Sequence, residues 1–395
     1  MAGVVALILG YVLSQFYRSF LAVLSPILDA ELGMGPSELS YANGIWFIIF
    51  ALMQFPVGKW LDTAGPRRTA SWLLAIGGGG GIALFAAATS PWIIMLAMGL
   101  IGVGCSPILM SAFVIFARQH PPERFATLAS TFLGIGTLGN VAGSGPLASA
   151  VEAFGWREVS VALAVFTVII GLAIFFLVKD PAKLEGGPQG GSVLDVLRIR
   201  KLWAIFPMVV MCYCVAAGIR GVWAGPYLSE VQGQDTGGIG MITFWMALAL
   251  SVGSIAYGPM DRIFHSRKWP VFIGNLIVLL ALVWLVMLSQ PSLQQVTIAF
   301  VAIGFFGASY PVLMAHGRSF IPAHLTGRGV TLINFFSIGG VGIIQFITGG
   351  YFRMVADPAN PATAYDNLFI LYAVLLAASL VGYLFAKDAK PSETA

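Results

Sequence analysis

The segment GKWLDTAGPRR, residues 58–68, recurs in altered form as GPMDRIFHSRK at residues 258–268. Both segments are short, charged and set between two long apolar runs, and they stand 200 residues apart. Arg118 and Arg318, each at the end of a later apolar run, show the same offset. Matches that agree in order and in spacing indicate an internal repeat, so the chain is expected to consist of two halves with one plan.

The composition is that of a membrane protein. The chain has 395 residues, of which 58% are hydrophobic and 10% charged, whereas soluble domains carry about 25% charged residues. Twelve apolar runs are long and continuous enough to cross about 30 Å of hydrocarbon as helices, and they lack the short alternating pattern of barrel strands. They lie at 3–28, 41–61, 69–89, 91–117, 126–152, 157–178, 202–228, 238–258, 270–290, 295–317, 327–353 and 364–386.

The predicted fold is therefore an all-α membrane protein with 12 transmembrane helices in two pseudo-symmetric six-helix bundles. The segment 179–201 is rich in Gly, Pro and charge, and it lies midway along the chain. We interpret it as a linker between an N-terminal bundle, residues 1–178, and a C-terminal bundle, residues 202–395. The glycine run 77–81 within the third apolar run predicts a close helix contact or a flexible point, because small residues let helices approach in lipid.

The distribution of basic residues predicts the orientation. All but four of the 21 Lys and Arg residues fall at one set of alternating ends of the apolar runs. Arg157 and Arg353 fall on the opposite side, and Arg18 and Arg220 lie inside runs. The positive-inside rule then places both termini and the linker in the cytoplasm, with the chain in the cytoplasmic (inner) membrane. The net charge of +4 reflects this topology, and we do not expect a nucleic-acid partner.

No pattern of catalytic or metal-ligating residues is visible. Cys105, Cys212 and Cys214 all fall inside apolar runs, where they are expected to pack as small apolar residues rather than to form disulfides or a metal site. We therefore predict no enzyme activity, no metal and no cofactor.

The charged segment also carries a family resemblance. The twelve expected spans and the segment 58–68 resemble the major facilitator superfamily, whose loop signature is Gly-x-x-x-Asp-x-x-Gly-x-Arg/Lys-Arg/Lys. The positions that match are Gly58, Asp62, Gly65, Arg67 and Arg68; the repeat at 258–268 keeps Gly258, Asp261, Arg267 and Lys268 but lacks the central Gly. The resemblance implies that these positions, with Asp261 for the second copy, gate the cytoplasmic side. Physically, Asp62 beside Arg67 and Arg68 can form a charged latch or cap a helix; the alternative is an ordinary basic loop.

Two arginines are not explained by topology. Arg18 and Arg220 lie near the middle of the first and seventh runs, while the Asp and Glu residues lie at the ends of runs or in loops. A guanidinium remains charged and is costly to hold in hydrocarbon, so a bound anion is the expected partner. The alternative is that either arginine bonds to backbone carbonyls or to a Glu at the end of a run.

The sequence around Arg18 carries a second resemblance. YRSFLAVLSPILDAELGMGPSELS, residues 17–40, is similar to the first-helix region of the anion:cation symporter and organophosphate antiporter branches of the superfamily, although Tyr17 stands where those branches often have Asp. The resemblance implies that Arg18 contacts an anionic substrate. An Arg in the seventh span, here Arg220, resembles the organophosphate antiporters.

Helical spacing and polarity suggest further substrate contacts. Tyr11 shares a helix face with Arg18, and Tyr213, Trp223 and Tyr227 share one with Arg220. Tyr310 and Asn334 are also expected to point inward, and an aromatic wall suits an organic anion. His316, near the end of the tenth run, is the candidate for proton coupling because its pKa lies near neutrality.

The function expected from these residues is alternating-access transport of a small organic anion, a carboxylate or an organophosphate. The protein is expected to act as a monomer in the lipid bilayer, coupled to a proton or to a counter-transported anion. The alternatives are a proton-coupled multidrug exporter of the same fold and a relative that senses rather than transports. The glycine-rich run 134–148 favours the exporter, and the lack of a carboxylate in the middle of any run counts against it.

Overall fold

The computed structural model describes residues 2–119, 122–181, 193–288, 290–322, 325–357 and 359–390, and their regular structure is entirely helical. The chain divides into two units. The first holds Met1–Glu185 with Gly221–Ser229 and Gly233–Phe244; the second holds Gly186–Arg220, Glu230–Gln232 and Trp245–Ala395. The expected division between an N-terminal and a C-terminal bundle stays a prediction, and residues 182–192 of the expected linker lie outside the described residues.

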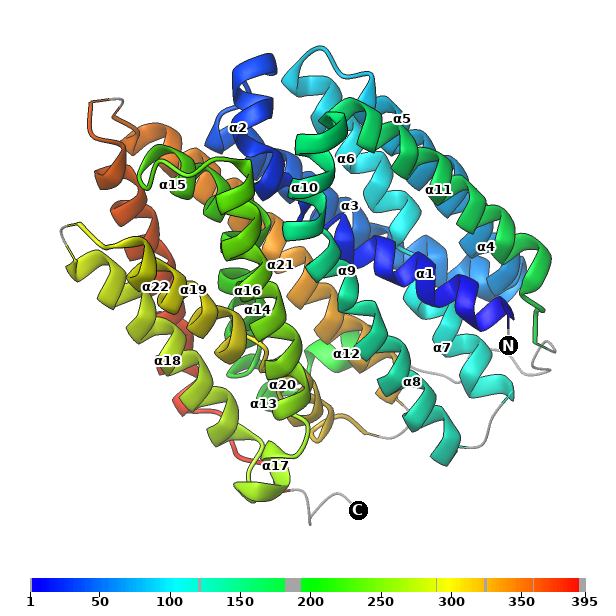
Figure 1. Cartoon of the computed structure of the whole chain (residues 1–395). Helices are drawn as coiled ribbons and strands as arrows, with labels where there is room; N and C mark the ends of the chain where they lie inside the picture. Colours follow the sequence, from blue (N-terminus) through cyan, green and yellow to red (C-terminus); the bar gives the residue numbers. More distant parts are fainter. Residues whose placement is uncertain are drawn as a thin grey trace. The chain divides into compact units, whose positions relative to one another are not determined.

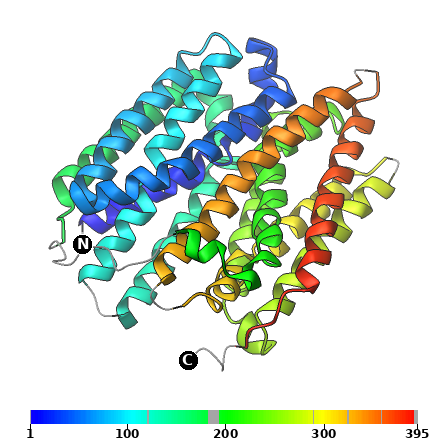
Figure 2. The same cartoon turned by 180° about the vertical axis from the view of Figure 1, so that it is seen from behind.

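Figures 1 and 2 show the helices of each unit running side by side. Up to the midpoint of the chain they are α1 Ala2–Phe16, α2 Phe20–Leu32, α3 Pro36–Thr63, α4 Pro66–Trp72, the π-helix η1 Leu73–Gly79, α5 Gly80–Ala86, α6 Pro91–Cys105, α7 Ile108–Gln119, α8 Pro122–Gly136, α9 Leu138–Ala142, α10 Gly145–Phe154 and α11 Trp156–Leu177. In this part α3 packs on α6, and α11 packs on α1 and on α5.

The second half repeats this order. Its helices are α12 Val193–Leu197, α13 Arg200–Trp203, α14 Phe206–Gly218, the π-helix η2 Ile219–Trp223, α15 Ala224–Glu230, α16 Thr236–Ala256, α17 Met260–Ile263, α18 Lys268–Met287, α19 Leu293–Phe306, α20 Tyr310–Arg318, α21 Thr326–Val355 and α22 Pro361–Leu384. Here α14 packs on α21, and α18 packs on α22.

The predicted membrane spans are largely confirmed. Ten stretches of the described chain are long and apolar enough to cross a bilayer, and α1 with α2 form an eleventh that is bent by 49°. The fifth expected run, 126–152, falls on α8, α9 and α10, and some of its side chains lie outside the described residues. It is broken near Thr137 and near Gly143, so it is not one continuous helix. The chain is therefore a multi-pass membrane protein.

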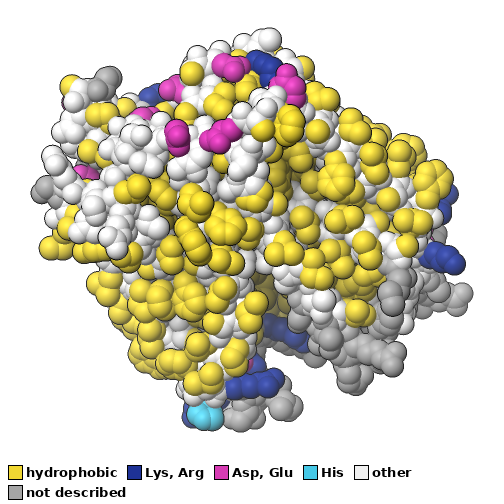
Figure 3. Space-filling view, viewed as in Figure 1, with side chains coloured by type: hydrophobic (Ala, Val, Ile, Leu, Met, Phe, Trp, Pro, Cys, Tyr) yellow, Lys and Arg dark blue, Asp and Glu magenta, His cyan; other side chains and the backbone are white. Residues whose placement is uncertain are grey.

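The outer surface of the helices is apolar, as a bilayer requires. On α11 five of the exposed apolar side chains follow one another at helical spacing; they are Val161, Val165, Ile169, Leu172 and Phe176. An apolar patch of this extent would be a liability in water. Figure 3 shows apolar side chains over much of the visible surface of each unit, with most visible acidic side chains toward the end at which α2 is drawn in Figure 1.

The glycine run brings two helices of the first unit into close contact, as predicted. A Cβ atom at Gly77 would lie 3.0 Å from the backbone nitrogen of Gly104, and a Cβ at Gly104 would collide with the backbone of Gly78. Helix α6 therefore touches η1 backbone to backbone. Gly80 is different, because a Cβ there would meet nothing within 4 Å.

This contact predicts that a glycine-to-alanine substitution lowers the thermal stability at Gly104 but not at Gly80. Gly104→Ala should lower the apparent melting temperature of the purified protein by about 3 °C, because overpacking costs roughly 2 kcal/mol. Gly80→Ala should leave it unchanged or raise it slightly, because alanine favours the helix. Thermal unfolding in detergent measures both variants. Equal melting temperatures would show that the contact between α6 and η1 is not tight.

Candidate functional site

Arg18 lies at a break in the first span. Helix α1 ends at Phe16 and α2 begins at Phe20, and the two are bent by 49° at this point. The N–H of Arg18 donates to the carbonyl of Gln15 at 3.3 Å, a turn rather than a helical bond. Interrupted membrane helices commonly line substrate sites, because irregular backbone is tolerated where it is buried in protein or faces a cavity. The break therefore puts Arg18 at a site-forming position.

The side chain of Arg18 lies against two aromatic rings that are stacked on each other. It is 6% exposed, and its Cζ lies 5.2 Å from the ring centroid of Trp46 and 5.1 Å from that of Phe50. These two rings stand one turn apart on α3 and are stacked, with centroids 5.0 Å apart. Aromatic faces attract a guanidinium, by about 2 kcal/mol when water is excluded. They fix the orientation of the cation without neutralising its charge.

Two N–H donors at this site have no acceptor. Nε of Arg18 and Nε1 of Trp46 are both buried, and neither has a hydrogen-bond partner among the described residues. No described carboxylate forms an ion pair with Arg18. A buried donor without a partner costs about 1–3 kcal/mol. The complement of two such donors is a group with acceptors only, and an ionised acid is of this kind.

The backbone at the break is fixed by its neighbours in the first unit. The hydroxyl of Tyr17 forms a hydrogen bond of 2.8 Å with that of Thr167, and the amide of Asn43 lies 3.5 Å from the carbonyl oxygen of Arg18. Gly221 also packs on this carbonyl, because a Cβ there would lie 2.8 Å from the oxygen. These contacts position Arg18 from outside its own helix.

Tyr11, expected on the face of Arg18, lies buried in an aromatic cluster. Its ring stacks on Phe132 with centroids 5.2 Å apart, and its hydroxyl accepts a hydrogen bond of 2.9 Å from the Nε2 of Gln15. The tyrosine is thus placed one and a half to two turns before the break, where its role as a substrate contact stays a prediction.

Arg220 also lies at an irregularity. It is 1% exposed and falls in the π-helix η2, which covers five residues between α14 and α15. Single π-helical turns inside α-helices are frequent at functional sites. The predicted burial of both arginines is confirmed, and each sits where its helix departs from regular geometry.

The remaining predicted substrate contacts differ in how deeply they are buried and in their partners. Trp223 and Tyr227 are buried, and Tyr213 is half-buried on α14. In the second unit the hydroxyl of Tyr310 donates to the side-chain oxygen of Asn334 at 3.0 Å, so the structure joins two of the predicted residues.

The charged loop of the first unit is arranged differently from the expected latch. Asp62 pairs with Arg118 at 3.0 Å rather than with Arg67 or Arg68. Arg67 instead turns to Asp180, which accepts its backbone N–H at 2.8 Å and lies 3.6 Å from its Nε. Gly65, with a φ of 88°, stands between Asp62 and α4 and lets Asp180 approach, because a Cβ there would lie 2.7 Å from the Oδ1 of Asp180. Gly58 is half-buried and Arg68 is exposed at this end.

The second unit repeats the bond from the start of its third span to a later aspartate, but its loop aspartate, Asp261, pairs with an arginine of the same loop, unlike Asp62. Asp388, which follows α22 as Asp180 follows α11, accepts the backbone N–H of Lys268 at 3.0 Å and the hydroxyl of Ser266 at 2.6 Å. Asp261 pairs with Arg267 at 3.4 Å. Although partial burial raises the pKa of Asp388, the hydrogen bonds from Ser266, Lys268 and the N–H of Ala389 outweigh it and hold that pKa below its usual value of 3.8.

His316 lies beside this cluster and is fully buried. Its Nδ1 is 2.6 Å from the hydroxyl of Tyr383, and its Nε2 is 2.9 Å from the carbonyl oxygen of Lys387. Both ring nitrogens therefore tie α20 to α22 and to the C-terminal segment. The proposed part of His316 in proton coupling stays a prediction.

The repeated helical plan, the loop at Gly58–Arg68 and the broken first span agree with a sequence comparison. The family model of the Major Facilitator Superfamily matches residues 7–233. The chain belongs to this superfamily. A bacterial homologue of the human lysosomal transporter Spinster has the same fold, with a TM-score of 0.78, 17% identity, and coverage of 97% of this chain and 96% of that one.

Two relatives carry names that refer to organic anions. The protein named "Probable sulfoacetate transporter SauU" of Cupriavidus necator is 24% identical over 275 residues, which is 65% of this chain and 64% of the relative's length. The protein named "Putative tartrate transporter" of Agrobacterium vitis is 20% identical over 390 residues, which is 91% of this chain and 84% of the relative. The chain thus spans less than two thirds of the first of these relatives.

Some residues of the site were not among the predicted contacts. Phe50 lies against Arg18 together with Trp46, which the sequence already offered as a residue that could point inward. Their spacing of one helical turn is the signal that they share a face. Asp180 and Asp388 cap the third helix of each repeat, and the signal there is the dipeptide Lys-Asp at 179–180 and again at 387–388. The loop of the first unit is recognisable in the sequence, but the carboxylate that Arg67 contacts comes from the end of a distant helix.

The capping by Asp388 predicts a stability effect with a defined pH range. Asp388→Asn should lower the free energy of unfolding by roughly 1 kcal/mol, since hydrogen bonds to a charged group are lost at a half-buried site. The folded pKa is below 3.8, so this stability is present above that pH and is lost only as the pH falls through the folded value. The difference in melting temperature should therefore be the same at pH 8 and at pH 5.

Asp195→Asn is the matched control, because Asp195 pairs with Arg198 on an exposed turn. It should change the free energy of unfolding by less than about 0.5 kcal/mol. An effect of Asp388→Asn that disappears between pH 8 and pH 5 would contradict the capping role.

Proposed function

We propose that this chain is a secondary transporter that moves a small organic anion across the cytoplasmic membrane by alternating access. The observation that carries this proposal is Arg18: a buried guanidinium against a stacked pair of aromatic rings, with its Nε and the Nε1 of Trp46 lacking acceptors among the described residues. A carboxylate, a sulfonate or a phosphate ester supplies acceptor oxygens to both donors. A cationic drug would be repelled by the charge of the guanidinium.

The second contact of the anion is Arg220. In this proposal each half of the chain contributes one arginine from an irregular turn, the break at residues 17–19 and the π-helix Ile219–Trp223. Sulfoacetate and tartrate, the compounds in the names of two relatives, each carry two acidic groups. Each acidic group of a dianion supplies acceptor oxygens for one guanidinium. We therefore infer a substrate with two acidic groups rather than one.

In this scheme transport requires the affinity for the anion to differ between the conformations of the protein. An anion held by both halves favours the state in which the site is enclosed, and this differential binding permits the halves to exchange access. The residues Gly58, Asp62, Gly65, Arg67, Arg68 and Asp261 belong to the proposed cytoplasmic gate. Both termini face the cytoplasm in this scheme, since the basic residues gather at that side. The protein works as a monomer, coupled to a proton or to a counter-transported anion.

Counterflow in proteoliposomes tests the proposal. The panel is tartrate, sulfoacetate, glycerol 3-phosphate and one hydrophobic cationic drug, with wild type, Arg18→Lys and Arg220→Lys compared. Lysine keeps the charge but cannot form the paired hydrogen bonds of a guanidinium. Each variant should lose roughly 10- to 100-fold in anion transport, which corresponds to about 1.5–3 kcal/mol for hydrogen bonds to a charged group.

The control is Arg198→Lys, because Arg198 is highly exposed and lies outside the proposed site and gate. It should transport as wild type does. Saturable anion transport that survives both Arg18→Lys and Arg220→Lys would overturn the proposal. Transport of the cationic drug alone would replace it with the exporter.

A further inference from the structure

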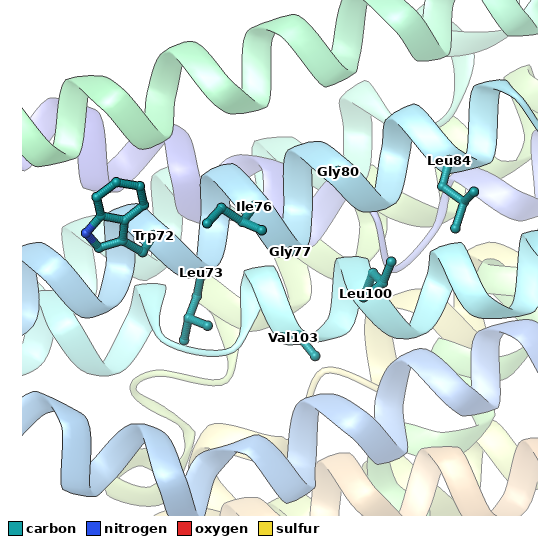
Figure 4. Close-up of a pocket in the computed structure, with 8 residues that line it drawn as sticks. All are labelled: Trp72, Leu73, Ile76, Gly77, Gly80, Leu84, Leu100 and Val103. Atoms are coloured by element: carbon teal, nitrogen blue, oxygen red, sulfur yellow. The ribbon is translucent and has the colours of Figure 1, made fainter.

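An apolar groove runs along the outside of the first unit, away from Arg18. It has a volume of about 550 Å³ and lies between the third span, α4–η1–α5, and α6. Figure 4 shows Trp72 and Leu84 at its two ends, with Leu100 and Val103 on the neighbouring helix. Its lining is Trp72, Leu73, Ile76, Gly77, Gly80, Leu84, Leu100 and Val103.

Glycines create the hollow. Gly77 and Gly80 stand in the floor of the groove, and neither fills it with a side chain. Gly80 is exposed and has open space where a Cβ would stand. The walls are large apolar side chains that point outward; Trp72 is 56% exposed and Ile76 is 66% exposed. A surface of this kind in a membrane protein faces lipid chains rather than water.

The groove has the length of a lipid chain. Trp72 and Leu84 are twelve residues apart on the third span, which corresponds to roughly 18 Å along a helix. The hydrocarbon of one leaflet is about 15 Å deep, half of the whole core. One acyl chain therefore fits along the groove within a single leaflet.

A basic side chain, Arg68, lies just beyond the Trp72 end of the groove. Arg68 precedes Trp72 by four residues on α4, so it lies on the same helix face one turn beyond the groove. Its side chain is exposed and forms no ion pair with a carboxylate in the described part of the chain. Lys59, at the end of α3, is also exposed at this end. The apolar groove thus ends in positive charge.

We propose that this groove is a binding site for one anionic phospholipid, with an acyl chain along Trp72–Leu84 and the phosphate on Arg68. A zwitterionic lipid shares the chain but lacks the net charge that Arg68 and Lys59 attract. The lining of the acyl-chain groove contains no proposed substrate contact, whereas Arg68 is also part of the proposed cytoplasmic gate. Lipid retention is therefore the quantity to measure, rather than transport.

Native mass spectrometry of the delipidated protein in mild detergent tests the site. The probes are dioleoyl phosphatidylglycerol and dioleoyl phosphatidylcholine, which differ only in the headgroup. Wild type should retain one phosphatidylglycerol several-fold more tightly than phosphatidylcholine. Arg68→Gln should weaken phosphatidylglycerol about fivefold, the effect of one basic residue at an anionic membrane surface, and weaken phosphatidylcholine less, because its choline cation offsets the charge of its phosphate.

Gly80→Leu fills the groove and should weaken both lipids alike. Gly382→Leu is its matched control, because Gly382 lies on α22 and has open space around a Cβ as well; Arg198→Gln is the control for the charge. Both controls should bind as wild type does, and thermal unfolding verifies that every variant is folded. Equal retention of the two lipids by wild type would overturn the proposal. So would a Gly80→Leu variant that binds like Gly382→Leu, or a mass corresponding to two protein chains joined without lipid.

Discussion

The free-energy cost of burying a guanidinium in hydrocarbon has to be offset by other interactions. The surroundings of Arg18 show how this chain offsets part of that cost. Moving an arginine to the centre of a bilayer costs about 2.5–3.5 kcal/mol by insertion measurements. The stacked rings of Trp46 and Phe50 return part of that cost. They leave the charge and the Nε donor unsatisfied among the described residues. We propose that a bound anion supplies the remainder, so that substrate binding and the burial of this charge are two parts of one constraint.

The scaffold around the arginines is a repeat that extends beyond the helices. In each half, the carboxylate that follows the sixth span accepts the backbone N–H at the start of the third span: Asp180 from Arg67, and Asp388 from Lys268. An acidic group at a helix N-terminus is favourable because of the helix dipole. These bonds close each six-helix group on itself at its basic end. Such closure suits two halves that move as rigid bodies.

The sequence predicted what depends on local pattern. Length and hydropathy placed the spans to within a few residues, as 41–61 against Pro36–Thr63 and 364–386 against Pro361–Leu384 illustrate. It did not predict the break at Tyr17–Ser19 or the π-helix at Arg220, because apolar residues flank both and the composition is that of a regular helix. The predicted pairing of Asp62 with Arg67 or Arg68 was also wrong. Asp62 pairs with Arg118, and Arg67, beyond the turn at Gly65, pairs with Asp180. Pairing between distant helices depends on backbone direction, which residue types alone do not encode.

The most direct measurement is the binding of dianions to the purified protein by isothermal titration calorimetry. Tartrate and sulfoacetate are titrated into wild type and into Arg18→Gln, with Arg198→Gln as the control. The account predicts measurable binding of at least one dianion to wild type and to the control. Arg18→Gln should bind it at least roughly tenfold more weakly, because the charge and its hydrogen bonds are gone. An affinity that is unchanged in Arg18→Gln would contradict the central role given to this arginine.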